Sequence, residues 1–108
     1  MIRVTVFQDS DGVRQGFRIS GHSDYSPDRE DILCSAVSAL AENCVNSVEA
    51  FTDDEPEHLA VNEDEGFLSF RLKTVSKESR LLLDSLVLGL EGIAESYDNY
   101  IQIEFEEV

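Results

Sequence analysis

Hydrophobic and polar residues alternate in five short segments of the chain, and each segment predicts a β-strand. At the start of the chain, Ile2, Val4 and Val6 point to one side and polar residues to the other. A turn signal at 10–12 follows, so residues 2–20 predict a hairpin. The five segments are residues 2–9, 13–20, 58–62, 67–73 and 100–106.

Two longer segments carry apolar residues at steps of three and four, which predicts helices with one buried face. The first helix is expected at 32–51, after Asp31, because an aspartate carboxylate accepts hydrogen bonds from the first N–H groups of a helix. The second is expected from Ser76, its cap, to Tyr97. The predicted buried stripes are Leu33, Val37, Leu40, Cys44, Val48 and Phe51 in the first helix, and Leu82, Leu83, Leu86, Leu90, Ile93 and Tyr97 in the second.

The order of these elements is β-β-α-β-β-α-β. Two hairpins, two helices and a closing strand predict an α+β fold in which two helices cover one mixed sheet. A chain of 108 residues has the size of one domain, so residues 1–108 are expected to form a single domain.

The net charge of the chain limits the kinds of molecule that are expected to bind it. Its 23 acidic and 8 basic residues give a formal net charge of −15. Nucleic acid and anionic membranes require a positive surface, so neither is expected as a partner. The charge favours a basic partner, or it serves solubility alone. The start of the chain lacks the apolar core of a secretion signal, and no apolar run approaches the roughly 20 residues that span a bilayer. The protein is therefore predicted to be cytoplasmic.

The two cysteines are not expected to pair. Cys34 and Cys44 lie ten positions apart on one predicted helix, about 15 Å at a rise of about 1.5 Å per residue. That separation is too long for a disulfide. Histidine, cysteine and carboxylate residues also lack the spacing of a zinc site, so we expect no metal and no cofactor.

The segment GHSDYSPDREDILCSAVSAL, residues 21–40, carries the candidate chemistry. Cys34 falls at the third position of the predicted helix, where unpaired N–H groups and the helix dipole favour a thiolate. His22 directly follows a strand, and a strand end packed against a helix start would bring its imidazole near the sulfur. Such a pair suits nucleophilic catalysis, in which the imidazole takes the thiol proton and later gives it to the leaving amine.

The same pattern also fits residues without a catalytic role. A cysteine near a helix start can be a small core residue, and a histidine at a strand end can be a surface residue. Asp31 has an ordinary explanation as a cap, with orientation of His22 as the alternative. Ser38, one turn after Cys34, can hydrogen-bond either the site or its own helix backbone.

A glycine–histidine pair after a strand, then a loop, then DILCSAVSAL, resembles the ribosomal-processing cysteine proteases of the Prp family. The motif covers a short part of the chain, while length and element order agree throughout. Leu33 and Ser35 are mild variants of the family pattern. The matching residues are His22, Asp31, Ile32, Cys34, Ala36, Val37 and Ser38.

The resemblance implies a layered α/β fold, often homodimeric, with Cys34 as nucleophile and His22 as base. Its implied substrate is the N-terminal extension of a large-subunit ribosomal protein of the bL27 type. A highly basic substrate also suits a chain of charge −15. The alternative is a non-catalytic acidic module that binds a basic ribosomal or chaperone client.

The loop before Asp31 departs from the family pattern. Relatives typically carry a glycine a few residues before the aspartate, whereas SDYSPDRED has none and contains Pro27 and Arg29. Proline fixes φ and arginine lacks the backbone freedom of glycine, so the movement of this loop and the cleaved sequence are expected to differ. The loop residues expected to meet a basic substrate are Asp24, Tyr25, Asp28 and Glu30.

Overall fold

The computed structural model describes residues 1–22 and 32–108, and these form five strands and two helices. Their order, β-β-α-β-β-α-β, is the predicted one, and each boundary differs from its predicted position by no more than two residues. The strands are β1 (Ile2–Gln8), β2 (Arg14–Ser20), β3 (Pro56–Asn62), β4 (Phe67–Leu72) and β5 (Ile101–Glu107); the helices are α1 (Ile32–Phe51) and α2 (Lys77–Ser96).

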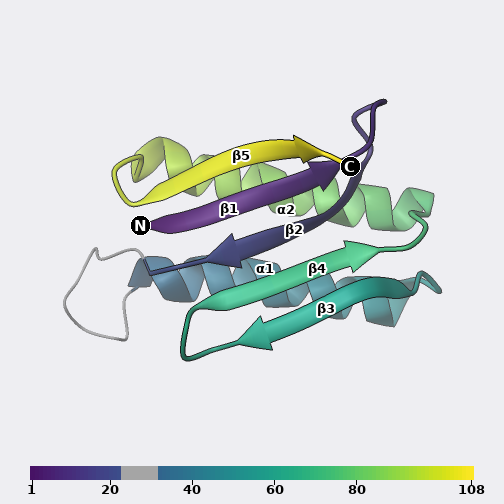
Figure 1. The fold of residues 1–108 in the computed structure, drawn as a ribbon, viewed down its shortest axis with the longest axis horizontal. Helices are drawn as coiled ribbons and strands as arrows, with labels where there is room; N and C mark the ends of the chain where they lie inside the picture. The colour runs from purple at the N-terminus through teal and green to yellow at the C-terminus, as the bar shows by residue number, and fades with distance from the viewer. Residues whose placement is uncertain (23–31) are drawn as a thin grey trace.

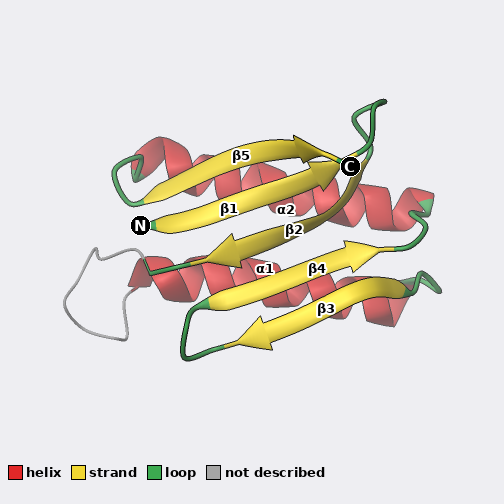
Figure 2. Cartoon of the chain, viewed as in Figure 1, coloured by secondary structure: helices red, strands yellow, loops and turns green. Residues whose placement is uncertain are grey.

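The five strands form one mixed sheet in the order β3-β4-β2-β1-β5. β1 and β5 are parallel, and the other neighbouring pairs are antiparallel. Figure 1 shows both helices behind the sheet, and Figure 2 shows the same two-layer arrangement by element type. The predicted α+β class is therefore confirmed. Neither of these helices is both long and apolar enough to cross a membrane.

The hydrophobic core lies between the sheet and the two helices. Val4 of β1 and Leu90 of α2 are completely buried within it. The rings of Phe17 and Phe70 meet there from neighbouring strands, with centroids 5.8 Å apart and planes tilted by 52°. Burial of such large side chains supplies most of the stabilisation available to a small domain.

The predicted buried stripe of α1 was wrong at three positions. Ala41 is buried, whereas Leu40 is only half-buried. The reason is that the buried face follows steps of four from Leu33 through Val37 to Ala41, which turns Leu40 to its margin. Phe51, the last residue of α1, is 73% exposed.

The stripe of α2 is shifted in a similar way. Val87 and Ser79 are buried, while Leu82 and Ile93 are half-buried and Tyr97 is exposed. Tyr97 is the C-cap residue, so it already lies past the helical turns that face the sheet.

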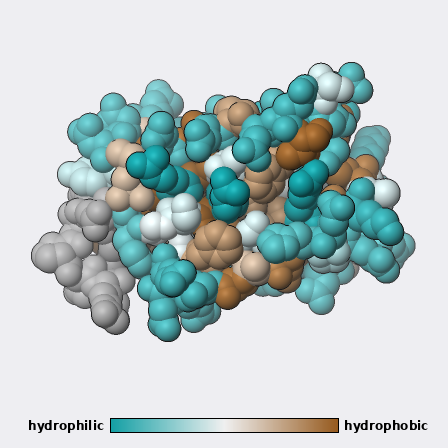
Figure 3. All heavy atoms as spheres, viewed as in Figure 1, coloured by the Kyte–Doolittle hydropathy of each residue, from teal (hydrophilic) through white to brown (hydrophobic). Residues whose placement is uncertain are grey.

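Two arginines cover an aromatic ring on the sheet face opposite the helices. Phe7 lies on this face and is only 7% exposed. The guanidinium carbons of Arg18 and Arg71 lie 5.6 and 5.9 Å from the centroid of its ring, and cations stack favourably on aromatic faces. Figure 3 shows this side as a largely hydrophilic surface with smaller apolar patches.

A carboxylate ties the end of α1 to the start of α2. Asp54 accepts hydrogen bonds from the backbone N–H of Ser76 at 2.9 Å and from the hydroxyls of Ser76 and Ser79. The Ser76 hydroxyl in turn accepts the N–H of Ser79 at 3.2 Å, as a helix cap does. The Ser76 and Ser79 hydroxyls hold the pKa of the Asp54 carboxyl below its ordinary value.

Asp54→Asn should lower the free energy of unfolding at pH 7 by about 1–2 kcal/mol, because it removes charge-assisted hydrogen bonds. A carboxyl whose pKa is depressed on folding contributes stability above its unfolded pKa and loses it as pH falls through the folded value. The difference between wild type and variant should therefore shrink below about pH 4, near the ordinary aspartate pKa. Urea unfolding at pH 7 and pH 3 measures both effects. Asp53→Asn is the matched control, since Asp53 is an exposed neighbour; equal losses in the two variants would contradict the prediction.

Candidate active site

His22 lies just beyond the end of β2, held in place by an unusual backbone at Gly21. Gly21 has φ of +86°, and a Cβ at this position would lie 2.5 Å from the carbonyl oxygen of Met1. Only glycine combines this φ with so close a backbone approach. The chain therefore leaves β2 in a direction that a larger residue would not permit, and this direction sets the position of the exposed His22 side chain.

The turn between β3 and β4 packs against the His22 ring. Gly66, in this turn, has φ of +64°. A Cβ at Gly66 would lie 2.6 Å from the Gly21 carbonyl oxygen, 3.0 Å from His22 Cε1 and 3.2 Å from His22 Nε2. The sequence places residues 63–66 between two predicted strands, but it gives no sign of this contact, because nothing local links two segments so far apart in the chain.

Cys34 is the third residue of α1, as predicted, and is half-buried. The start of a helix carries a partial positive charge and N–H groups outside the regular helical pattern. Both stabilise negative charge, either on a thiolate or on the oxygen of a tetrahedral intermediate. The position of Cys34 thus meets the requirement for a nucleophilic sulfur.

His22, Cys34 and Ser38 line one open cavity of about 640 Å³ between α1 and the β3–β4 hairpin. We call this cavity the α1–β3 groove. The structure thus brings together three of the residues singled out in the sequence, from the end of β2 and the first turns of α1. The other lining residues are Ile2, Ile19, Gly21, Ser35, Val37, Ala41, Glu42, Val45, Asn46, Glu49, Leu59, Val61, Glu63, Gly66, Phe67 and Leu68.

The remaining predicted site residues lie outside the part of the chain that the structure describes. They are Asp24, Tyr25, Asp28, Glu30 and Asp31. Their predicted roles, including the choice between helix capping and orientation of His22 for Asp31, stay predictions. Within residues 1–22 and 32–108, no three histidine, cysteine or carboxylate side chains gather closely enough to hold a metal ion.

The second cysteine belongs to the core. Cys44 is buried on the inner face of α1, and its thiol donates a long hydrogen bond of 3.8 Å to the Leu82 carbonyl oxygen. Burial raises the pKa of the Cys44 thiol to about 11. His58 lies on the edge strand β3 and is exposed. The position of Cys44 agrees with its place in the predicted buried stripe of α1.

Iodoacetamide at pH 7.5 should alkylate Cys34 at least about a hundredfold faster than Cys44. The reagent reacts with thiolates, and with a pKa of about 11 only roughly three in ten thousand Cys44 thiols are ionised at that pH. Peptide mass spectrometry after timed quenching measures both rates in one sample. The Cys34→Ser variant is the control, and it should take up almost no label. Equal rates at both cysteines in the folded protein would contradict the expectation.

Comparison with known proteins places this site in a family context. The sequence profile of one family, described as Cysteine protease Prp, matches residues 1–102. A ribosomal processing cysteine protease Prp from Staphylococcus aureus is 26% identical over 109 residues, covering 98% of this chain and 100% of that protein. A protein of the same name from Bacillus subtilis is 27% identical over 108 residues, covering 95% and 96%.

A solved structure agrees with the fold. The crystal structure of the ribosomal processing protease Prp from S. aureus, in complex with a covalently linked product peptide, superposes with a TM-score of 0.90. The two sequences are 25% identical, and the alignment covers 98% of this chain and 100% of that one. The similarity therefore extends over the whole domain, including the elements that carry His22 and Cys34.

Proposed function

The chain belongs to the cysteine protease Prp family, and from this premise we propose that it removes the N-terminal extension of a large-subunit ribosomal protein of the bL27 type. The observation that carries the proposal is the family match over residues 1–102, together with the presence of His22 and Cys34 in one groove. The relatives named as ribosomal processing proteases support the choice of substrate.

In the proposed mechanism, Cys34 is the nucleophile and His22 is the base. His22 accepts the thiol proton, and the sulfur attacks the carbonyl carbon of the scissile peptide bond. The N–H groups at the start of α1 stabilise the oxyanion. His22 then donates the proton to the leaving amine, which departs as the C–N bond breaks and a thioester forms. Water, deprotonated by His22, hydrolyses the thioester and restores the thiol.

The charge of the chain supports a basic substrate. At a net charge of −15, the protein attracts basic proteins over distances limited by the ionic strength. Ribosomal proteins carry many lysines and arginines because they bind RNA. Electrostatic attraction would therefore raise the rate of encounter between enzyme and precursor more than the affinity of the complex.

The proposal is tested by incubating the purified chain with the unprocessed ribosomal protein and identifying the products by mass spectrometry. The expected result is one cut that releases the N-terminal extension, while the mature protein stays intact as the control. A precursor that remains uncut by protein with a reduced, alkylatable Cys34 would contradict the proposal.

The proposal also includes a cytoplasmic location, where a ribosomal substrate would be met, and a homodimeric state, which the resemblance to the family implies. Light scattering on the purified chain measures the second point. A solution mass of twice the single chain supports the dimer, and the mass of one chain argues against it.

A further inference from the structure

The α1–β3 groove extends far beyond the residues that would carry out the chemistry. One of its walls is a single face of α1, which runs from Cys34 to Glu49. These two residues are fifteen positions apart, so the wall is about 22 Å long at a rise of about 1.5 Å per residue. The α1 residues on this wall are Cys34, Ser35, Val37, Ser38, Ala41, Glu42, Val45, Asn46 and Glu49.

The opposite wall is apolar and open to solvent. Leu59 and Val61 of β3 pair with Phe70 and Leu68 of β4, so their side chains point to the face of the sheet that carries the helices. They nevertheless remain 49% and 58% exposed. β3 lies at one edge of the sheet, and Figure 1 shows α1 crossing behind it only near the C-terminal end of the helix. An exposed apolar strip beside a groove is typical of a peptide-binding surface.

A second, smaller cavity continues the groove toward the C-terminal end of α1. It shares Val45, Glu49 and Leu59 with the first cavity and reaches Asp53 beyond the helix. The two cavities therefore lie next to each other along the helix. Beyond Cys34, toward the C-terminal end of α1, there is room for several residues of an extended chain.

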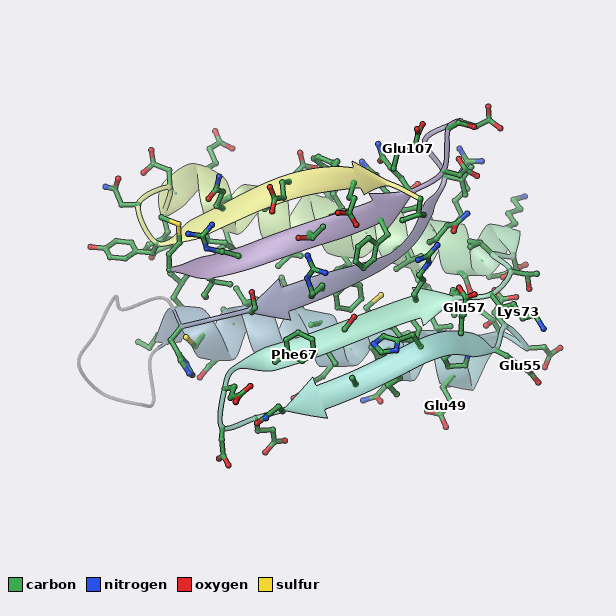
Figure 4. The ribbon with its side chains drawn as sticks, in the orientation of Figure 1. Glu49, Glu55, Glu57, Phe67, Lys73 and Glu107 are labelled. Atoms are coloured by element: carbon green, nitrogen blue, oxygen red, sulfur yellow. The ribbon has the colours of Figure 1, made fainter. Side chains whose placement is uncertain are left out.

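The charged residues of the α1–β3 groove all carry the same sign. Glu42 and Glu49 line it from α1, and Glu63 from the turn after β3. No lysine or arginine is present among the described residues that line either cavity. Figure 4 shows Glu49 projecting from α1 beyond the edge of the sheet. All three glutamates are exposed, and together they would attract a basic side chain that lies along the groove.

We propose that the α1–β3 groove selects an extended substrate segment with basic side chains at about four and about seven residues from the scissile bond. The distances from Cys34 along α1, about 12 Å to Glu42 and about 22 Å to Glu49, correspond to those spacings at about 3.3 Å per residue. The residues between the two basic ones would lie along Leu59 and Val61 on the opposite wall. This inference rests on the proposed function, because it assumes that Cys34 marks the scissile bond.

The test compares two series of cleavable peptides that differ only in having lysine or glutamate at those spacings, placed on each side of the scissile bond in turn. The wild type should prefer lysine, and Glu42→Lys/Glu49→Lys should reduce the lysine-to-glutamate ratio of kcat/KM by about tenfold or more. Because a ratio is measured, a general loss of activity in the variant does not affect the result.

Glu91→Lys/Glu95→Lys is the matched control. Both glutamates are exposed on α2, line neither cavity and change the net charge equally. This variant should leave the ratio within about twofold, since distant surface charges are screened by salt. Equal ratios in wild type and both variants would overturn the selection by the groove while leaving proteolysis in place. Failure of the wild type to cut either peptide series and the full precursor would overturn the proposed function instead.

Discussion

Cys34→Ala should lower the rate of precursor cleavage by at least roughly a thousandfold, because it removes the attacking atom of the proposed reaction. The unfolding free energy should change by less than about 1 kcal/mol, since the side chain is half-buried at the edge of the core and keeps its Cβ. Cleavage is followed by mass spectrometry under single-turnover conditions, and stability by urea unfolding. The combination of a folded protein and an absent activity is what separates a nucleophile from a packing residue.

Cys44→Ala provides the matched control within the same helix. The Cys44 side chain is 4% exposed in the core, so its truncation should cost about 1–2 kcal/mol of stability through the lost contacts. It should leave the cleavage rate of the folded fraction within about threefold, because Cys44 does not line the α1–β3 groove. If Cys34→Ala, produced in a host without the related protease, cleaves the precursor at the wild-type rate, then Cys34 is not the nucleophile.

The order of the strands and helices was predictable because the hydrophobic periodicity and the helix caps indicate the same element boundaries. β1 alternates between apolar and polar residues from Ile2 to Val6, and α2 combines a helical stripe with Ser76, whose hydroxyl does accept the N–H of Ser79. Such local agreement between pattern and cap makes boundaries accurate to within a few residues. The break between the predicted strands at 58–62 and 67–73 is likewise present, as the turn between β3 and β4.

The depth of each helical face was less predictable. Sequence periodicity identifies an apolar stripe but not how the helix is rotated against the sheet. As a result, Ala41 is buried, whereas Leu40, which was expected in the buried stripe, is only half-buried. Leu59 and Val61 alternate like core residues, yet they remain exposed because they line the open α1–β3 groove. These outcomes depend on how elements pack, which one sequence does not state.

The candidate site shows the same division. His22 and Cys34 were identifiable because they lie close together in sequence, at a strand end and a helix start. The α1–β3 groove was not, since its walls come from α1 and the β3–β4 hairpin. The contact between Gly66 and His22 joins positions 44 apart in the chain, and turn composition alone gives no sign of it.

Gly66→Ala should lower kcat for precursor cleavage by about tenfold to a hundredfold with little change in KM. The added Cβ would meet both the Gly21 carbonyl oxygen and the His22 ring. The nearest of these atoms, the Gly21 carbonyl oxygen, belongs to the backbone. The steric clash can therefore be relieved only if the turn or the imidazole moves. A displacement of about 1 Å in a catalytic group can cost about a hundredfold in rate. Steady-state kinetics on wild type and variant separate kcat from KM.

Two controls separate the displacement of His22 from simple backbone strain at Gly66. Gly12 also has a left-handed φ, +81°, but nothing lies within 4 Å of a Cβ placed there. Gly12→Ala should therefore show the roughly 1 kcal/mol destabilisation of an alanine in this region without the loss of kcat. In a His22→Ala background, Gly66→Ala should have almost no further effect on kcat, since the group that it displaces is already gone. If Gly12→Ala loses as much kcat as Gly66→Ala, or if the Gly66 effect persists without the imidazole, then the β3–β4 turn does not position His22.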